Sequence, residues 1–295
     1  LNPGDDVAVD VTNTAKGLDV RVTGGSFDAR ALIKQLTSPN TSKPATQNGI
    51  SLTASIGTVT GFNSESLKGV RAIYRGGGAT SVTGKTSSGA PFSMDDAQEG
   101  NVRRISASTG NAGDVLRFLN LYGRMQGGAL NLSLAGSSTL RGKVEVLDFD
   151  IVNEPKLSSV VGTGSNNGNL DRATKGKINT ARVRFDRGFA EFAKSATSLK
   201  LDNAVLRGPV IGTTFEGTVY DENNQTNLTG TFLPAYGING IFGDIPILGA
   251  FLGGGENGGL IGVTYRLRGD LKSPQLSVNP LSATAPGMFR KIFEY

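Results

Sequence analysis

The stretch LNLSLAGSSTLRGKVEVLDFDI, residues 130–151, decides the fold class of this protein. Its apolar residues recur at every second position, at Leu130, Leu132, Leu134, Val144 and Val146. The alternation then slips by one residue and resumes at Phe149 and Ile151. A period of two predicts β-strands that present one apolar face.

The same alternation continues along the rest of the chain. It predicts further strands at 7–11, 18–22, 50–56, 183–185, 199–201, 215–219 and 261–267. Turn-forming glycine, asparagine and aspartate residues separate these segments, which favours antiparallel strands with short connections. Strands do not alternate with long helices, so a doubly wound α/β fold is not expected.

Helical spacing is confined to short segments. We expect helices at 29–36 and 113–125, and two more at 238–252 and 287–294 near the C-terminus. The polar segments 37–49, 86–101 and 162–177 are expected to be loops. The expected fold is therefore mainly β: a long curled antiparallel sheet with an open hydrophobic groove, accompanied by short helices that include C-terminal capping helices.

The composition excludes several kinds of chemistry. The 295 residues contain no cysteine, histidine or tryptophan, so a thiolate nucleophile, an imidazole base and a usual zinc site are all excluded. The net charge of +5 is not gathered into a basic patch, so we expect no nucleic-acid partner. A chain without thiols is compatible with an oxidising compartment such as a periplasm.

Two motifs that could suggest other functions have simpler interpretations. Gly253, Gly255 and Gly258 have the spacing of a dinucleotide-binding loop, but a helical segment precedes them and a strand follows, the reverse of the required order. The pairs Asp5-Asp6 and Asp95-Asp96 are interpreted as solvated turns. We therefore expect no catalytic residues, cofactor or metal, and no enzymatic activity.

An apolar segment at 241–252 has almost no polar face. It is expected either to plug the end of a sheet core or to contact a membrane. The residues expected at that contact are Ile241, Phe242, Ile245, Leu248, Phe251 and Leu252.

Several stretches of the sequence resemble a known family. They are GDDVAVDV (4–11), GGSFDARALIKQL (24–36), NAGDVLRFLNLYGRMQGGALNL (111–132), LRGKVEVLDFDIVNEPKLSSVV (140–161) and the C-terminal block at 230–293, with its closing NPLSATAPGMFR. Together they resemble the C-terminal region of the AsmA-like superfamily, in particular the group of large periplasmic proteins that includes YhdP and TamB.

This resemblance implies a bridge-like lipid carrier. Such proteins are anchored in the inner membrane by an N-terminal helix, absent from this chain, and extend a curled sheet across the periplasm. Phospholipids or other acyl lipids move along its apolar face between the inner and outer membranes, which supports outer-membrane lipid homeostasis. Proteins of either membrane are candidate partners, and residues 1–295 form one region, divided into a first part of the groove (1–110) and a helix-capped part (111–295).

Thirteen residues are expected to contact lipid. They are Leu130, Leu132, Leu134, Val144, Val146, Phe149, Val183, Phe185, Leu199, Leu201, Phe215, Val219 and Phe232. The same residues could instead form a closed core, and the sequence does not decide which phase of each strand faces inward. A structural or adhesive surface protein, with a β-solenoid or a barrel-associated fold, is the alternative function.

Overall fold

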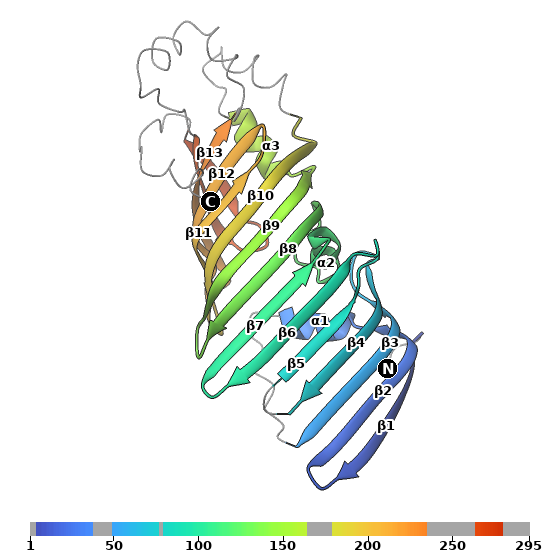
Figure 1. The fold of residues 1–295 in the computed structure, drawn as a ribbon. Coiled ribbons are helices and arrows are strands. Elements are labelled where there is room, and N and C mark those ends of the chain that lie inside the picture. The colour runs from blue at the N-terminus through green and yellow to red at the C-terminus, as the bar shows by residue number, and fades with distance from the viewer. Residues whose placement is uncertain (1–3, 38–48, 77–78, 164–178, 235–262, 280–295) are drawn as a thin grey trace, which may run out of the picture. The chain divides into compact units, whose positions relative to one another are not determined.

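The structure, a computed structural model, describes residues 4–37, 49–76, 79–163, 179–234 and 263–279. Fifteen strands form one sheet in which neighbours follow the order of the chain, so that β1 and β15 are its two edge strands. Figure 1 labels the strands from β1 to β13. Three short helices accompany them among the described residues. The predicted mainly-β class with an open sheet is therefore confirmed.

The strands are mostly seven to thirteen residues long. Their bounds are β1 Asp6–Thr14, β2 Gly17–Asp28, β3 Ile50–Thr60, β4 Ser66–Arg75, β5 Ala79–Lys85, β6 Pro91–Glu99, β7 Val102–Thr109, β8 Met125–Gly136, β9 Leu140–Val152, β10 Arg182–Lys194, β11 Leu199–Arg207, β12 Ile211–Tyr220, β13 Gln225–Pro234, β14 Val263–Asp270 and β15 Gln275–Asn279. The helices are α1 Arg30–Thr37, α2 Ala112–Phe118 and α3 Pro155–Thr163.

The chain forms two compact units, which are described separately below. Unit 1 comprises residues 1–146 and 193–197, and unit 2 comprises 147–192 and 198–295. The division falls within β9. The expected subdivision at residue 110 stays a prediction.

One strand pairing in unit 1 differs from the expected antiparallel arrangement. Strands β2 and β3 pair in parallel, from Leu18 opposite Ile50 to Asp28 opposite Thr60. A parallel pair needs a crossover connection, since a tight hairpin reverses the chain. The connection from Asp28 to Ile50 contains α1, which confirms the helix expected at 29–36.

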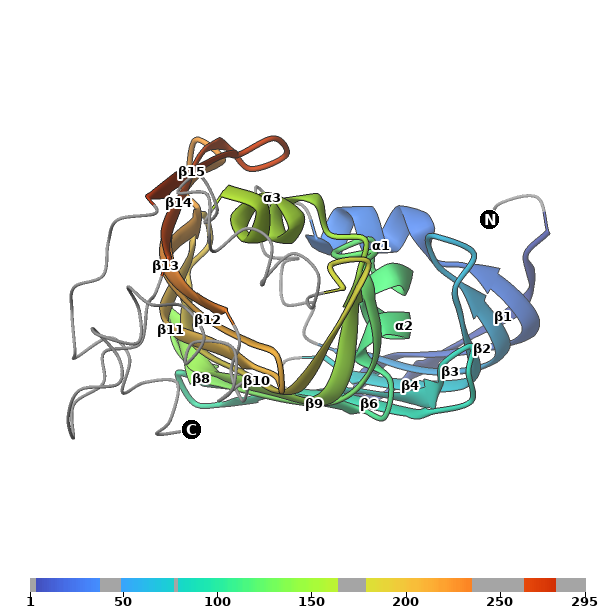
Figure 2. The same cartoon turned by 90° about the horizontal axis from the view of Figure 1, so that it is seen from above.

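Helices α1 and α2 both pack on one face of the unit 1 sheet (Figure 2). Ile33 of α1 and Phe118 of α2 belong to one buried cluster with residues of β3 and β4. Helix α2 is shorter than the expected 113–125. Asn111 caps its start by accepting a hydrogen bond from the Asp114 backbone N–H at 3.1 Å, and the helix ends at Phe118, two residues before Asn120 takes a φ of 55°.

A cluster of ion pairs fixes α2 to the loops at this end of the sheet. Arg117 donates to Glu65 at 2.6 Å, to Asp114 at 2.7 Å and to the Met125 carbonyl at 2.7 Å. The two carboxylates also accept hydrogen bonds from Ser87 and Ser88 in the β5–β6 turn. Each charged group thereby keeps a partner although both carboxylates are largely buried.

The expectation of a loop at 86–101 is wrong for most of that segment. Residues 91–99 form β6, which pairs with β5 and β7 along its length. Asp95 and Asp96 consequently lie on a strand and not in a solvated turn. The aspartates obscure the alternation in the sequence, and the neighbouring strands supply the pairing.

The register slip expected in β9 is confirmed. Asp148 has a φ of 56°, and Leu147 and Asp148 are both exposed, while Phe149 is 1% exposed. This is the geometry of a β-bulge, which shifts the apolar phase by one residue. The apolar side of β9 therefore continues through the irregular residue.

The sheet of unit 2 is curled. Helix α3, which follows β9 directly and was not expected, contacts β15. The sheet from β9 to β15 therefore curls round, so that its last strand approaches the helix that follows β9 (Figure 2). On the buried side, the Phe149 and Phe185 rings stack with centroids 5.3 Å apart.

Some expectations lie outside the described residues. They are the helices at 238–252 and 287–294, the glycine motif at 253–258 and the contact residues at 241–252. Among the residues that the structure does describe, none of the helices has the length and apolar character needed to cross a bilayer.

Candidate functional site

An uninterrupted apolar row crosses the strands β1 to β8 of unit 1. Its members pair successively from β1 to β8, and we call them the central row: Val9, Val22, Ala54, Ala72, Val82, Met94, Ala107 and Leu132. Strands lie about 4.8 Å apart, so the row is about 34 Å long. Local alternation in eight separate segments thus becomes one extended apolar strip.

Two further rows flank the central row on the same side. The first contains Val7, Gly24, Ile56, Val70, Gly84, Phe92, Thr109 and Leu130. The second contains Val11, Val20, Leu52, Tyr74, Thr80, Asp96, Ile105 and Leu134. The three rows together are the apolar face of unit 1.

The other phase of the same strands is polar. The row that runs beside the central row consists of Ala8, Thr23, Ser55, Arg71, Thr83, Ser93, Ser108 and Asn131. The sheet of unit 1 is therefore amphipathic from strand to strand, with one side mainly apolar and the other mainly polar.

The helices and the cluster that they form with β3 and β4 bury the apolar face only in part, and within the central row only Ala54 is fully buried. Ile56 and Val70, which pack with α1 and α2, are 8% and 6% exposed. In the central row, Val82 and Met94 are half-buried, and Val9 is 53% exposed. A closed core would bury this row more completely. The face therefore keeps apolar surface that another molecule can cover.

Charge enters the apolar face of unit 1 at one place. Asp96, in the second flanking row, receives two hydrogen bonds from the Arg103 guanidinium, one of them from Nε to Oδ1 at 2.8 Å. This pairing raises the pKa of Arg103 further above its usual range. The Arg103 guanidinium therefore remains charged at any physiological pH.

Unit 2 has an apolar face with the same construction. Across β11 to β15, one row contains Leu201, Gly217, Leu228, Leu267 and Leu276. The next contains Ala204, Phe215, Gly230, Tyr265 and Val278. The opposite phase has a row of Lys200, Thr218, Asn227, Arg268 and Gln275, so this part of the sheet is amphipathic as well.

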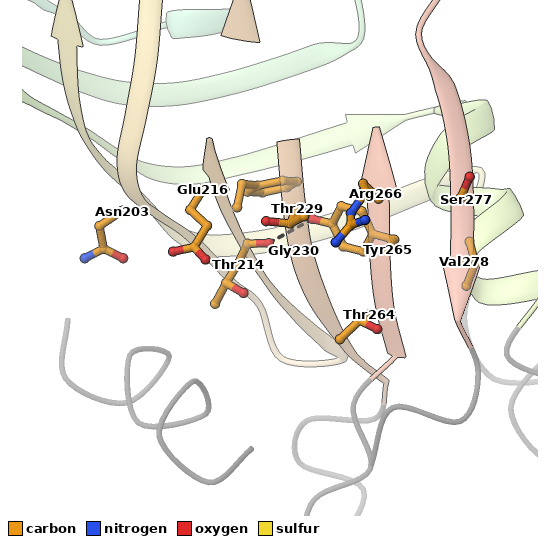
Figure 3. Close-up of a pocket in the computed structure, with 11 residues that line it drawn as sticks. Asn203, Thr214, Glu216, Thr229, Gly230, Thr264, Tyr265, Arg266, Ser277 and Val278 are labelled. Carbon is orange, nitrogen blue, oxygen red and sulfur yellow. Dashed lines mark hydrogen bonds between the residues drawn. The ribbon is translucent and has the colours of Figure 1, made fainter. Parts of the chain in front are cut away.

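Tyr265 fills the space above a glycine in this face (Figure 3). A Cβ on Gly230 would lie 2.1 Å from the Thr214 carbonyl oxygen and 2.5 Å from the Tyr265 side chain, so a side chain larger than hydrogen does not fit there. The ring meets Phe215 edge-on at 5.8 Å, and the hydroxyl donates to the Thr214 carbonyl at 2.9 Å. Burial raises the pKa of Tyr265, and a hydrogen bond with Thr213 offsets part of this rise. The phenol is a packing element and not an acid–base group.

A cavity of about 480 Å³ lies against these strands. Its lining residues come from all five strands β11 to β15 and include Phe215, Tyr265 and Val278 (Figure 3). Polar residues of the other phase, such as Glu216 and Arg266, also line it. Its volume is within the range of small-molecule sites.

The thirteen residues expected to contact lipid are all buried or half-buried. Leu134, Val146, Phe149, Val183, Phe185 and Phe232 are buried. Leu130, Leu132, Val144, Leu199, Leu201, Phe215 and Val219 are half-buried. The structure also decides the phase of β10, since Phe185 is 1% exposed and Arg184 has an exposed side chain. Lipid contact by these residues stays a prediction.

Sequence reasoning missed the middle of the unit 1 face. Val82, Met94, Ala107 and Ile105 were not selected, because polar residues interrupt the alternation on β5 to β7. The signal was present as apolar residues two positions apart, such as Phe92 and Met94. Only the pairing with β4 and β8 shows that these short patterns continue one row.

The described residues contain no group of side chains able to hold a metal ion. No protein-family model, curated protein or solved structure matches the chain. The resemblance to AsmA-like proteins consequently stays a prediction from sequence. The arrangement that the structure does provide is an extended, one-sided apolar surface.

Proposed function

We propose that this protein binds phospholipids or other acyl lipids on the apolar face of its sheet and carries them between the inner and outer membranes, without catalysis. The observation that carries the proposal is the central row of unit 1, which is apolar on eight consecutive strands and half-buried along most of them. The periplasmic setting and the two membranes come from the sequence resemblance.

The physical argument rests on the kind of contact that such a face makes. Each methylene group removed from water contributes about 0.8 kcal/mol, and this contribution does not depend on direction. An acyl chain can therefore move from one strand to the next while it loses and gains equivalent contacts. The polar opposite phase leaves that side compatible with water, so the two sides of the sheet have different roles.

The proposal is tested with a matched pair of adjacent positions on β5. A photoreactive residue replaces half-buried Val82 in one variant and exposed Thr83 in the other, and each protein is illuminated with phospholipid vesicles. We expect lipid adducts at position 82 and few at position 83.

Circular dichroism of both variants checks that the sheet is intact. Equal labelling of folded proteins at positions 82 and 83, or no adduct at either, would contradict lipid binding on this face. The second result would favour the alternative of a structural or adhesive surface protein. Transfer of labelled phospholipid between donor and acceptor vesicles then tests carriage as distinct from binding.

A further inference from the structure

The apolar face of unit 1 has a polar margin on the side away from its helices. Within the three rows, Asp96 is the single charged residue. Its partner Arg103 lies on β7, two residues before Ile105 and therefore on the same side of the sheet. Tyr74 and Thr80, in the same row as Asp96, add two hydroxyl groups to this margin.

The ion pair stays accessible to solvent. The side chains of Arg103 and Asp96 are 38% and 20% exposed. In a fully buried ion pair, each group needs the other to offset the free-energy cost of its desolvation, so such a pair would be explained by packing alone. An accessible pair beside an apolar strip can exchange partners with a charged ligand at little cost in solvation.

The distance across the face is long enough for the acyl chains of one lipid monolayer. Arg103 and Thr109 are six positions apart along β7, a length of about 20 Å at about 3.4 Å per residue. Thr109 is buried and lies just before the α2 cap at Asn111. Half of a hydrocarbon core about 30 Å thick is about 15 Å, so acyl chains lying along the strands fit between the ion pair and the helices.

We propose that Asp96 and Arg103 select zwitterionic phospholipids whose headgroup carries a primary amine. This inference rests on the proposed function. The headgroup ammonium pairs with Asp96 and the phosphate with Arg103, so one ion pair within the protein becomes two with the lipid. Arginine is suited to phosphate because its guanidinium donates two parallel hydrogen bonds. An anionic lipid without an amine would leave its phosphate near Asp96 uncompensated.

The test uses vesicles of equal amounts of phosphatidylethanolamine and phosphatidylglycerol, with mass spectrometry of the lipid that stays bound to the repurified protein. We expect the unmodified protein to enrich phosphatidylethanolamine about two- to fivefold, the selectivity that one accessible ion pair can give. Asp96→Asn, which keeps the shape and a hydrogen bond to Arg103, is expected to return the ratio to that of the vesicles. Arg103→Gln is expected to lower the amount of both lipids.

The control is Asp95→Asn, which removes the adjacent carboxylate from the exposed opposite side of β6 and should leave the ratio unchanged. Bound lipid in the vesicle ratio, with no change in Asp96→Asn, would overturn the headgroup inference and leave lipid binding intact. No bound lipid on the unmodified protein would instead remove the proposed function itself.

Discussion

Replacing Arg117 with methionine is expected to destabilise unit 1 strongly. Arg117 is 23% exposed in its side chain and neutralises Glu65 and Asp114, which are 11% and 7% exposed. Methionine fills much of the same space but leaves two largely buried carboxylates without a cation. Breaking a buried ion pair in this way typically costs about 3–5 kcal/mol.

This loss is large against the usual total stability of a domain, about 5–15 kcal/mol. At about 2–4 °C per kcal/mol for a domain of this size, it corresponds to a melting temperature about 6–20 °C lower. Thermal unfolding followed by circular dichroism measures the shift. Because α2 is fixed through Arg117, the loss should appear first as faster hydrogen exchange in 112–118.

Two further variants make this prediction specific. Arg117→Met combined with Glu65→Gln and Asp114→Asn removes the uncompensated charges and should recover part of the stability. Arg104→Met breaks an ion pair with Glu99 in which both side chains are exposed, so it should cost at most about 1 kcal/mol. If Arg117→Met and Arg104→Met shift the melting temperature equally, the buried cluster does not stabilise unit 1 as argued.

Three further predictions concern local packing and charge. Gly230→Ala should cost about 1–3 kcal/mol in urea unfolding, because its Cβ would meet the Thr214 carbonyl oxygen at 2.1 Å and the Tyr265 side chain at 2.5 Å, and a neutral result would contradict this close packing. Phe185→Ala should cost about 3–5 kcal/mol, since its ring is 1% exposed, whereas exposed Arg184→Ala should cost at most about 1 kcal/mol. The Asp28 carboxyl should titrate by NMR with a pKa of about 2, because the side chain and the backbone N–H of Arg30 donate hydrogen bonds to it. Because the pKa is lowered in the folded protein, this contact stabilises the fold at pH values above the usual aspartate pKa, and the stabilisation is lost as the pH falls towards 2. A titration midpoint near pH 4 would exclude the contact.

Much of the sheet could be predicted from local pattern. The alternation around Phe149 predicted both the strand and the slip that the structure realises as a bulge at Asp148. The helix at 29–36 was equally recognisable. These features depend on residues close together in the chain, where the period of two or 3.6 directly reflects which side chains share a face.

The middle of the unit 1 face could not be predicted in the same way. On β6, Asp96 occupies a position where alternation requires an apolar residue, so the segment resembled a loop. Its charge is explained only by Arg103, which reaches it from the next strand. The parallel pairing of β2 with β3 could not be predicted for a related reason. It depends on the position at which the chain re-enters the sheet after the crossover that contains α1.

The sequence alone determined that this protein is built from strands with one apolar phase, that conventional thiol and imidazole chemistry is excluded, and where the helix α1 forms. The tertiary structure alone decided which phase faces inward, how eight short patterns join into one row, and which part of the apolar face the helices cover. The physical reason is that alternation is a property of each strand, whereas a continuous apolar face depends on the register between strands that lie far apart in the chain.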